Sequence, residues 1–107
     1  MHTIAYSSQS LIREKDVERE LKNILDVAQN YNLENGITGV LFFSDNIFLQ
    51  ILEGHQVNLR TLMKKIEDDR RHENVTYLMD HKVQDRTLTG WTMQIFNLNN
   101  KNKLSLE

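Results

Sequence analysis

The stretch that decides the fold is GITGVLFFSDNIFLQILEG, residues 36–54. Two apolar runs flank Asp45-Asn46, and both of these residues tolerate the positive φ of a two-residue turn, so the pattern predicts a β-hairpin. Because strand side chains alternate between faces, counting outward from the turn places three cross-strand pairs on one face of the sheet. These pairs are Phe43 with Phe48, Leu41 with Gln50, and Gly39 with Leu52.

Gln50 is a polar amide in the middle of this apolar face. Burying an amide without hydrogen bonds costs roughly 1–3 kcal/mol, so the face that carries Gln50 must also hold a polar partner or a ligand. Two interpretations follow from the strand alone. Gln50 is either a core residue bonded to a backbone group or a tyrosine, or part of a binding site.

The rest of the chain continues the pattern as β-α-β-β-α-β-β. Strands are expected at residues 2–8, 75–83 and 90–96, in addition to the hairpin. Apolar residues at helical spacing predict two helices, the first carrying Val17, Leu21, Ile24, Leu25 and Ala28, and the second carrying Leu59, Leu62, Met63 and Ile66. A charged run follows at residues 67–73. Two helices packed on one face of a mixed sheet define a ferredoxin-like α+β fold.

Composition predicts a single small domain. The chain has 107 residues, of which 39% are hydrophobic and 26% charged. Its 13 basic and 15 acidic residues give no electrostatic support for binding nucleic acid or an anionic membrane. No apolar run is long enough to span a bilayer and no signal peptide is present, so we expect a cytoplasmic protein. The absence of cysteine excludes disulfides and thiolate metal sites.

Several motifs together resemble the BLUF family, the blue-light sensors that use FAD. They are Tyr6-Ser7-Ser8, the segment from Asn32 through Gly36 to Asp45, Phe48 to Gly54, Asp69-Arg70-Arg71-His72 and Trp91-Thr92-Met93. The resemblance extends from about Thr3 to Asn97, in the family's order and approximate spacing. It implies a photosensor domain at residues 1–97, followed by a polar C-terminal tail at residues 98–107.

The resemblance implies that Asn32 and Gln50 are amides facing a flavin, with Ile24 and Ile66 lining its ring. Ile24, Ala28 and Asn32 also fall on one helical stripe, at i, i+4 and i+8. The simpler interpretation is ordinary core for the isoleucines and a helix terminus for Asn32. The cofactor is expected to be FAD, with FMN as second candidate. The predicted cofactor-binding residues are Tyr6, Ile24, Ala28, Asn32, Phe48, Gln50, Lys65, Ile66, Asp69, Arg71 and His72.

Tyr6 is expected to supply the photochemistry. In the family, the matching tyrosine gives an electron to the light-excited flavin, and the matching glutamine changes its rotamer or tautomer. Trp91 and Met93 share one face of the predicted last strand, so either residue is a candidate to approach Gln50. The alternatives are a Tyr6 hydroxyl bonded to water and a Trp-Met pair that is plain core.

Two features depart from the family or leave the cofactor's phosphates without a dedicated site. Tyr31 stands where many members have a second polar residue, often Asn. The chain also lacks the Gly-rich loop of dinucleotide-binding folds, so the diphosphate is expected near the surface beside Lys65, Arg71 and His72. The simpler interpretation of these charges is a solvated face.

The second face of the hairpin is also apolar, and soluble monomers rarely leave such a patch exposed. Either the chain is a core cut from a longer protein whose next segment covers this face, or the face is an interface for a second copy or a downstream partner. The residues expected there are Val40, Phe42, Ile47, Leu49 and Ile51.

The sequence therefore predicts a non-enzymatic blue-light receptor domain that binds a flavin non-covalently. The alternative is a flavin-free ferredoxin-like module that interacts or dimerises through its outer sheet face. A flavin-dependent redox enzyme ranks third, because no histidine forms a nucleophile constellation with another motif.

Overall fold

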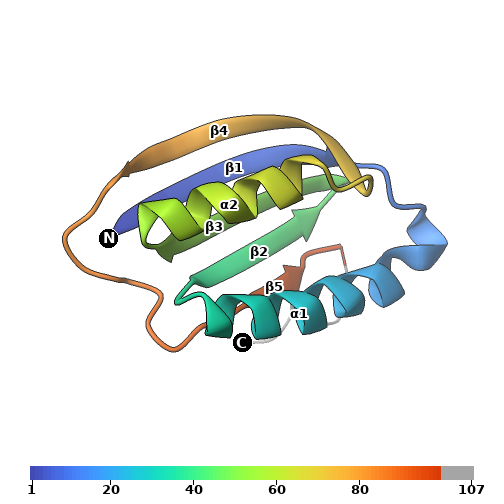
Figure 1. Cartoon of the computed structure of the whole chain (residues 1–107). Helices are drawn as coiled ribbons and strands as arrows, with labels where there is room; N and C mark the ends of the chain where they lie inside the picture. Colours follow the sequence, from blue (N-terminus) through green and yellow to red (C-terminus); the bar gives the residue numbers. More distant parts are fainter. Residues whose placement is uncertain (100–107) are drawn as a thin grey trace.

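The computed structural model describes residues 1–99. Its elements follow the predicted order, with a single 3-10 turn at Glu14–Asp16 before the first helix. No helix among these residues is long and apolar enough to cross a membrane. The strands and helices are β1 (His2–Ser10), α1 (Val17–Glu34), β2 (Thr38–Ser44), β3 (Ile47–Gly54), α2 (Gln56–Glu67), β4 (His72–Lys82) and β5 (Gln94–Asn97), as Figure 1 shows.

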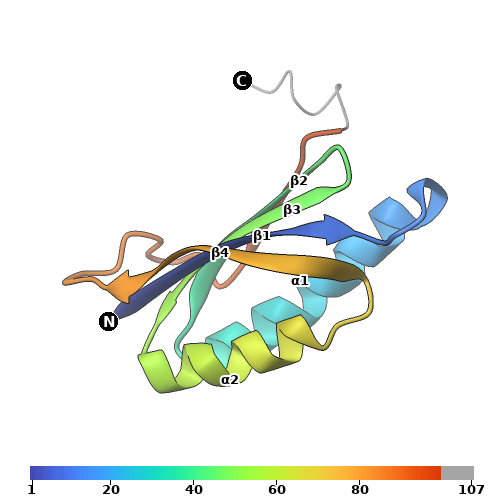
Figure 2. The same ribbon diagram turned by 90° about the horizontal axis from the view of Figure 1, so that it is seen from above.

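The five strands form one mixed sheet in the order β4-β1-β3-β2-β5. All neighbours pair antiparallel except β2 and β5, which are parallel. Both helices lie on the same side of this sheet (Figure 2), where Leu59 and Met63 of α2 are buried against it. The predicted ferredoxin-like α+β fold is confirmed.

The central hairpin has the predicted register. Asp45 and Asn46 form the turn with φ of 51° and 65°, the left-handed values that these residues tolerate. The three predicted pairs of Phe43 with Phe48, Leu41 with Gln50, and Gly39 with Leu52 are all present. Turn chemistry therefore determines which face Gln50 occupies.

The starts of β4 and β5 differ most from the prediction. β4 begins at His72, inside the charged run, because Ser10 at the end of β1 pairs with it. The last strand begins only at Gln94. The chain turns before it, where Gly90 has φ of 82° and the Trp91 N–H donates to the Leu88 carbonyl.

The start of the predicted C-terminal tail is attached to the sheet. The Leu98 N–H donates to the Phe43 carbonyl at 2.8 Å, and the Asn99 side-chain oxygen accepts from the Asp45 N–H at 2.8 Å. Residues 98 and 99 thus close over the hairpin turn. The remainder of the tail, 100–107, lies outside the described residues.

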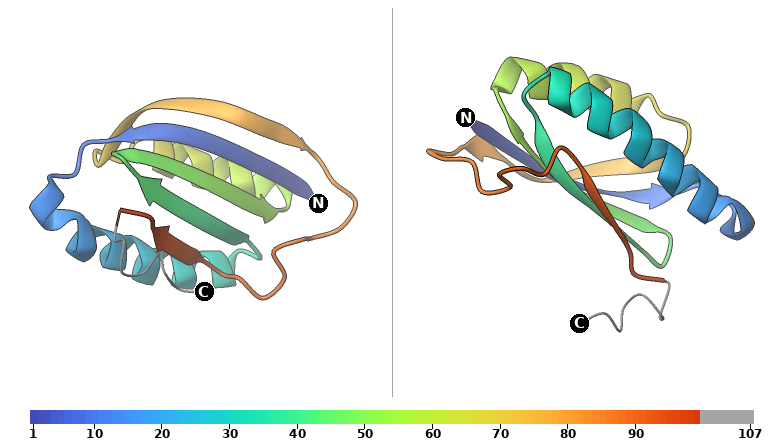
Figure 3. Two further views of the ribbon diagram at one scale, coloured as in Figure 1. Left: turned by 180° about the vertical axis from the view of Figure 1, so that it is seen from behind. Right: turned by 90° about the horizontal axis from the view of Figure 1, so that it is seen from below.

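The connection between β4 and β5 runs from one edge of the sheet to the other, as Figure 3 shows in orange. The buried Glu53 carboxylate holds it by accepting from the N–H groups of Thr87 and Leu88 and from the Thr87 hydroxyl, at 2.5–2.9 Å. Next to it, Arg86 donates to the Thr38 hydroxyl at 2.8 Å. These bonds fix the path by which the chain reaches Trp91 and Met93.

Candidate functional site

A cavity of about 190 Å³ opens between the two helices and the inner face of the sheet. Every residue predicted to bind the cofactor lies on its wall, whereas Trp91 does not. The lining residues are Tyr6, Ile24, Val27, Ala28, Tyr31, Asn32, Leu41, Phe48, Gln50, Leu62, Lys65, Ile66, Asp69, Arg71, His72 and Met93.

Gln50 is bonded on both sides at the floor of this cavity. The register between β1 and β3 places Tyr6 directly opposite Gln50, and the Tyr6 hydroxyl donates to Gln50 Oε1 at 2.5 Å. Gln50 Nε2 lies 3.9 Å from Met93 Sδ, a weak acceptor. The amide therefore keeps hydrogen-bonding capacity for a further group in the cavity. The structure confirms that Gln50 is buried and bonded to a tyrosine, and its place in a binding site stays a prediction.

The phenol of Tyr6 is protonated at neutral pH. Burial raises its pKa above the ordinary value of 10.0, and the negative charge of Asp69 raises it further. Tyr6 is thus a neutral hydrogen-bond donor to Gln50 rather than a phenolate.

Asn32 has a buried side-chain oxygen without a partner among the described residues. This atom is Oδ1, whereas Nδ2 donates to the Thr92 carbonyl at 2.6 Å. An orphaned buried acceptor costs about 1–3 kcal/mol, so it calls for a donor from a molecule in the cavity. The polar edge of an isoalloxazine ring offers an N–H between two carbonyl oxygens, which fits the Asn32 acceptor and the Gln50 amide donor.

Met93, not Trp91, occupies the position beside Gln50. Met93 is 1% exposed, whereas Trp91 is 38% exposed and lies outside the cavity. The prediction that both residues share a face of the last strand is wrong, because both precede β5. The Trp91 carbonyl accepts from Gly39 of β2 and the Met93 carbonyl from Gln29 of α1. The alternation of side chains along a strand therefore does not apply to these two residues.

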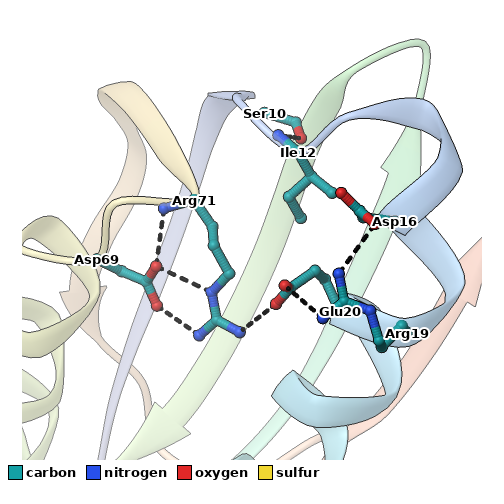
Figure 4. A network of polar contacts seen from close by, with 7 residues as sticks. All are labelled: Ser10, Ile12, Asp16, Arg19, Glu20, Asp69 and Arg71. Atoms are coloured by element: carbon teal, nitrogen blue, oxygen red, sulfur yellow. Dashed lines mark hydrogen bonds and ion pairs between the residues drawn. The ribbon is translucent and has the colours of Figure 1, made fainter.

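An ionic cluster flanks the cavity between α1 and the turn after α2 (Figure 4). Arg71 donates to both oxygens of Asp69, at 3.0 and 2.7 Å, and its third nitrogen reaches Glu20 at 3.3 Å. The hydrogen bonds from Arg71 lower the pKa of Asp69 below its usual range. Two carboxylates therefore already compensate the charge of Arg71.

His72 and Lys65 are the other predicted phosphate neighbours. His72 Nε2 donates to the Ile66 carbonyl at 2.5 Å, its Nδ1 lies 2.7 Å from the Ser8 hydroxyl, and its ring packs near those of Tyr6 and Phe48. Lys65 is in no ion pair among the described residues, and its ammonium lies 5.8 Å from the centre of the Tyr31 ring. Lys65 thus brings an uncompensated positive charge to the cavity wall.

Four wall residues are not among the site residues predicted from the sequence. Val27 and Tyr31 lie one turn from Ile24 and Ala28 on α1, and Leu62 lies one turn before Ile66 on α2, so a wider helical stripe would have included them. Leu41 is the predicted cross-strand partner of Gln50, a position that is also typical of core. Tyr31 differs from the polar residue that is usual in the family, so the family pattern does not point to it.

The family model for sensors of blue light using FAD (BLUF) matches residues 1–94. Among curated proteins, the chain is 27% identical over 96 residues to the blue light- and temperature-regulated antirepressor BluF of Escherichia coli, covering 90% of this chain and 23% of that protein. It is 30% identical over 103 residues to photoactivated adenylate cyclase subunit alpha of Euglena gracilis, covering 96% of this chain and 10% of that protein. The chain thus spans less than a quarter of these relatives.

Solved structures agree with this assignment. The photo-activated state of BlsA superposes with a TM-score of 0.86 at 33% identity, covering 97% of this chain and 75% of that one. Klebsiella pneumoniae BlrP1 with FMN and cyclic diGMP superposes with a TM-score of 0.84 at 34% identity, covering 92% of this chain and 26% of that one. The chain belongs to the BLUF family and is a flavin-binding blue-light photoreceptor domain, with FAD as the family's chromophore. This result favours the photoreceptor over the flavin-free module; the domain boundary at residue 97 remains a prediction.

Proposed function

We propose that Tyr6 and Gln50 form the photoswitch of this receptor. A bound flavin supplies the absorption of blue light and a strong electron acceptor. When Tyr6 gives an electron to that acceptor, its hydroxyl becomes strongly acidic, and the proton moves along the 2.5 Å hydrogen bond to Gln50 Oε1; the return of an electron and a proton to Tyr6 then restores its phenol. The Gln50 amide then changes rotamer or tautomer, which rearranges the hydrogen bonds at the cavity floor. The observation that carries this proposal is the buried Tyr6–Gln50 bond on the wall of a cavity that Asn32, with its unpaired side-chain oxygen, also lines.

The cavity wall divides into an apolar clamp and a polar edge. We assign the clamp on the ring to Ile24, Ala28, Phe48 and Ile66, since all four face the cavity. Asn32 and Gln50 would hold the polar edge of the ring. This division explains how a flavin stays bound without a covalent link.

At the phosphate end, Lys65 is the best candidate. The charge of Arg71 is compensated by Asp69 and Glu20, and His72 already has partners on both ring nitrogens. Lys65 has neither constraint. One uncompensated cation suits FAD and FMN alike, and it contributes charge rather than bidentate recognition.

Two substitutions test the switch. Tyr6→Phe removes only the hydroxyl, and Gln50→Ala removes the amide, while the apolar clamp remains. We expect both variants to retain flavin but to lose the light-induced red shift of its absorption, because the hydrogen bond that carries the proton is gone. The measurement is the difference between dark and illuminated absorption spectra.

Tyr77→Phe is the matched control. Tyr77 is the residue opposite Tyr6 on β4, and its hydroxyl bonds to Glu67 at 2.6 Å, away from the cavity. It should keep the full red shift. Retention of that shift in Tyr6→Phe or Gln50→Ala would refute the assignment of the switch to these two residues.

The light signal must also leave the domain. We propose that the receiver is a protein domain or a second copy that contacts the outer face of the sheet, opposite the helices. The support is the apolar character of that face. The cyclase and antirepressor activities named for the longer relatives belong to those proteins.

A further inference from the structure

Three consecutive carbonyl groups before β5 are bonded to three different donors. The Trp91 carbonyl accepts from the Gly39 N–H at 2.8 Å, the Thr92 carbonyl from Asn32 Nδ2 at 2.6 Å, and the Met93 carbonyl from Gln29 Nε2 at 3.2 Å. The segment leaves a turn at Gly90 and enters β5 only at Gln94. Its position therefore depends on β2 and α1 rather than on a continuous strand.

Gln29 has a different place from Asn32. The two amides lie one turn apart on α1, so they face the same segment. Asn32 lines the cavity, whereas Gln29 does not, and its side-chain bond goes to the Met93 backbone. Gln29 can thus affect the cavity through Met93 without touching a ligand.

The Met93 side chain packs closely against Gly39. A Cβ added at Gly39 would lie 3.2 Å from Met93 Cε and 2.8 Å from Leu52 Cδ2, both closer than ordinary contact. Any residue larger than glycine at position 39 would therefore crowd the Met93 methyl group. Met93 Sδ lies 3.9 Å from Gln50 Nε2. Gly39 thus leaves room for the Met93 side chain, and Gln29 donates to the Met93 backbone carbonyl.

We propose that Gln29 is a positioning residue of the photoswitch, a latch that keeps Met93 beside Gln50 and Trp91 outside the cavity. The side chain at this place sets the hydrogen bonding of Gln50, because a thioether offers a weak acceptor whereas an indole offers an N–H donor. Releasing the Met93 carbonyl removes one of the bonds that favour the Met93 arrangement. The inference rests on the proposed role of Gln50.

The test compares Gln29→Glu with Asn30→Asp. Glutamate keeps the size of Gln29 but cannot donate to the Met93 carbonyl, and Asn30→Asp adds the same charge at the next, exposed position. Two readouts are used on the flavin-loaded protein: the rate of dark recovery of the flavin spectrum, and acrylamide quenching of Trp91 in the dark. Trp91 is the single tryptophan of the chain, so its fluorescence is unambiguous.

For Gln29→Glu we expect recovery to change by about two- to tenfold, the factor that one hydrogen bond contributes. Trp91 quenching should fall, because Trp91 enters the space that Met93 leaves. Gln29→Ala should behave likewise, whereas Gln29→Lys, which restores an N–H donor of similar reach, should return both values toward wild type. Asn30→Asp should match wild type.

The latch is refuted if Gln29→Glu and Gln29→Ala both match Asn30→Asp in recovery and in Trp91 quenching. A wild-type protein without any red shift would instead overturn the proposed switch. In that case Trp91 quenching, which needs no photocycle, still decides whether Gln29 holds the segment.

Discussion

Asn32 uses the two ends of its amide for different purposes. Nδ2 donates to the Thr92 carbonyl and so connects α1 to that segment, and Oδ1 is buried without a partner among the described residues. The oxygen therefore gains most from a bound ring, because an N–H of the ligand would satisfy an acceptor that is otherwise buried and unpaired. We therefore propose that Asn32 serves cofactor retention more than photochemistry.

Asn32→Ala should weaken flavin binding more than it alters the red shift. The lost pairing is worth about 1–3 kcal/mol, which raises the Kd by about 5- to 150-fold. Flavin release during dialysis measures it, with Asn30→Ala on the exposed side of the same helix as control. An unchanged Kd in Asn32→Ala would reduce Asn32 to a helix terminus.

At the residue scale, the sequence showed where Gln50 lies but not what it touches. The pairing of Leu41 with Gln50 follows from a local turn, so counting was sufficient. The contact with Tyr6 depends on which strand lies beside β3, a long-range choice that alternation does not determine. The placement of Met93 rather than Trp91 beside Gln50 depends on hydrogen-bond donors from β2 and α1. One of these donors, Gln29, has no feature in the sequence that distinguishes it from other polar helix residues.

Among the elements, the connection between β4 and β5 is the least regular and is held by a buried charge. The Glu53 carboxylate accepts from the Thr87 and Leu88 backbone and from the Thr87 hydroxyl. It shares β3 with Gln50 but points to the opposite face, since the two positions differ by an odd number. One strand thus carries the candidate switch on one side and the anchor of the Met93 segment on the other.

Glu53→Ala should destabilise the protein by about 1–3 kcal/mol, because the N–H groups of Thr87 and Leu88 lose their acceptor. Glu53→Gln keeps one oxygen and should cost less. Urea unfolding measures the free energy, and amide hydrogen exchange at Thr87 and Leu88 locates the effect. Glu34→Ala, at an exposed position on α1, is the control. If Glu53→Ala unfolds at the same urea concentration as this control, the hydrogen bonds of Glu53 contribute nothing to the free energy of unfolding.

Elements held by interactions local in sequence were predicted better than elements held by long-range ones. The hairpin is set by its own turn and alternation, so its register and the limits of β3 are as predicted, whereas β2 begins at Thr38 rather than at Gly36. The last strand was predicted too early because Gly90 turns the chain and the carbonyl groups after it bond to residues far away in the sequence. β4 was predicted too late because its first residues look like a solvated charged run, yet they extend the pairing with β1.

On the scale of the whole molecule, the helices cover one face of the sheet and leave the other without helical cover among residues 1–99 (Figure 2). The outer patch is less exposed than predicted, because Val40 is only 3% exposed and three other members, Phe42, Leu49 and Ile51, are half-buried. Phe42 stacks on Phe96 of β5 at 5.5 Å, so part of the predicted patch is covered by the sheet's own edge strand. Ile47 remains 41% exposed.

The patch also reaches further than predicted. Met79 of β4 pairs with Ala5, which in turn pairs with Ile51, so Met79 shares the outer face and is 42% exposed. The outer face therefore carries apolar side chains from the β4 edge to the β5 edge. Burying such side chains in an interface stabilises it by roughly 1.5–3 kcal/mol for each one that becomes fully buried.

This surface should associate with a second copy of the chain at working concentration unless another segment covers it. Leu49 lies at its centre, in a shallow hollow lined also by Phe42, Ile47 and Leu98. Leu49→Lys places a charge there and should shift the protein to monomer, because burying an unpaired ammonium is costly. The inner face with Gln50 should be unaffected, so an unchanged flavin spectrum serves as the folding control.

Val57→Lys is the matched substitution for sedimentation. Val57 is an apolar residue on α2, on the helical side of the molecule, and is 75% exposed. It should sediment like wild type, whereas Leu49→Lys should sediment as the smaller species across the same concentrations. A wild-type chain that stays monomeric at high concentration, with no covering segment bound to the outer face, would contradict the interface, because the apolar surface would then have no partner to bury it.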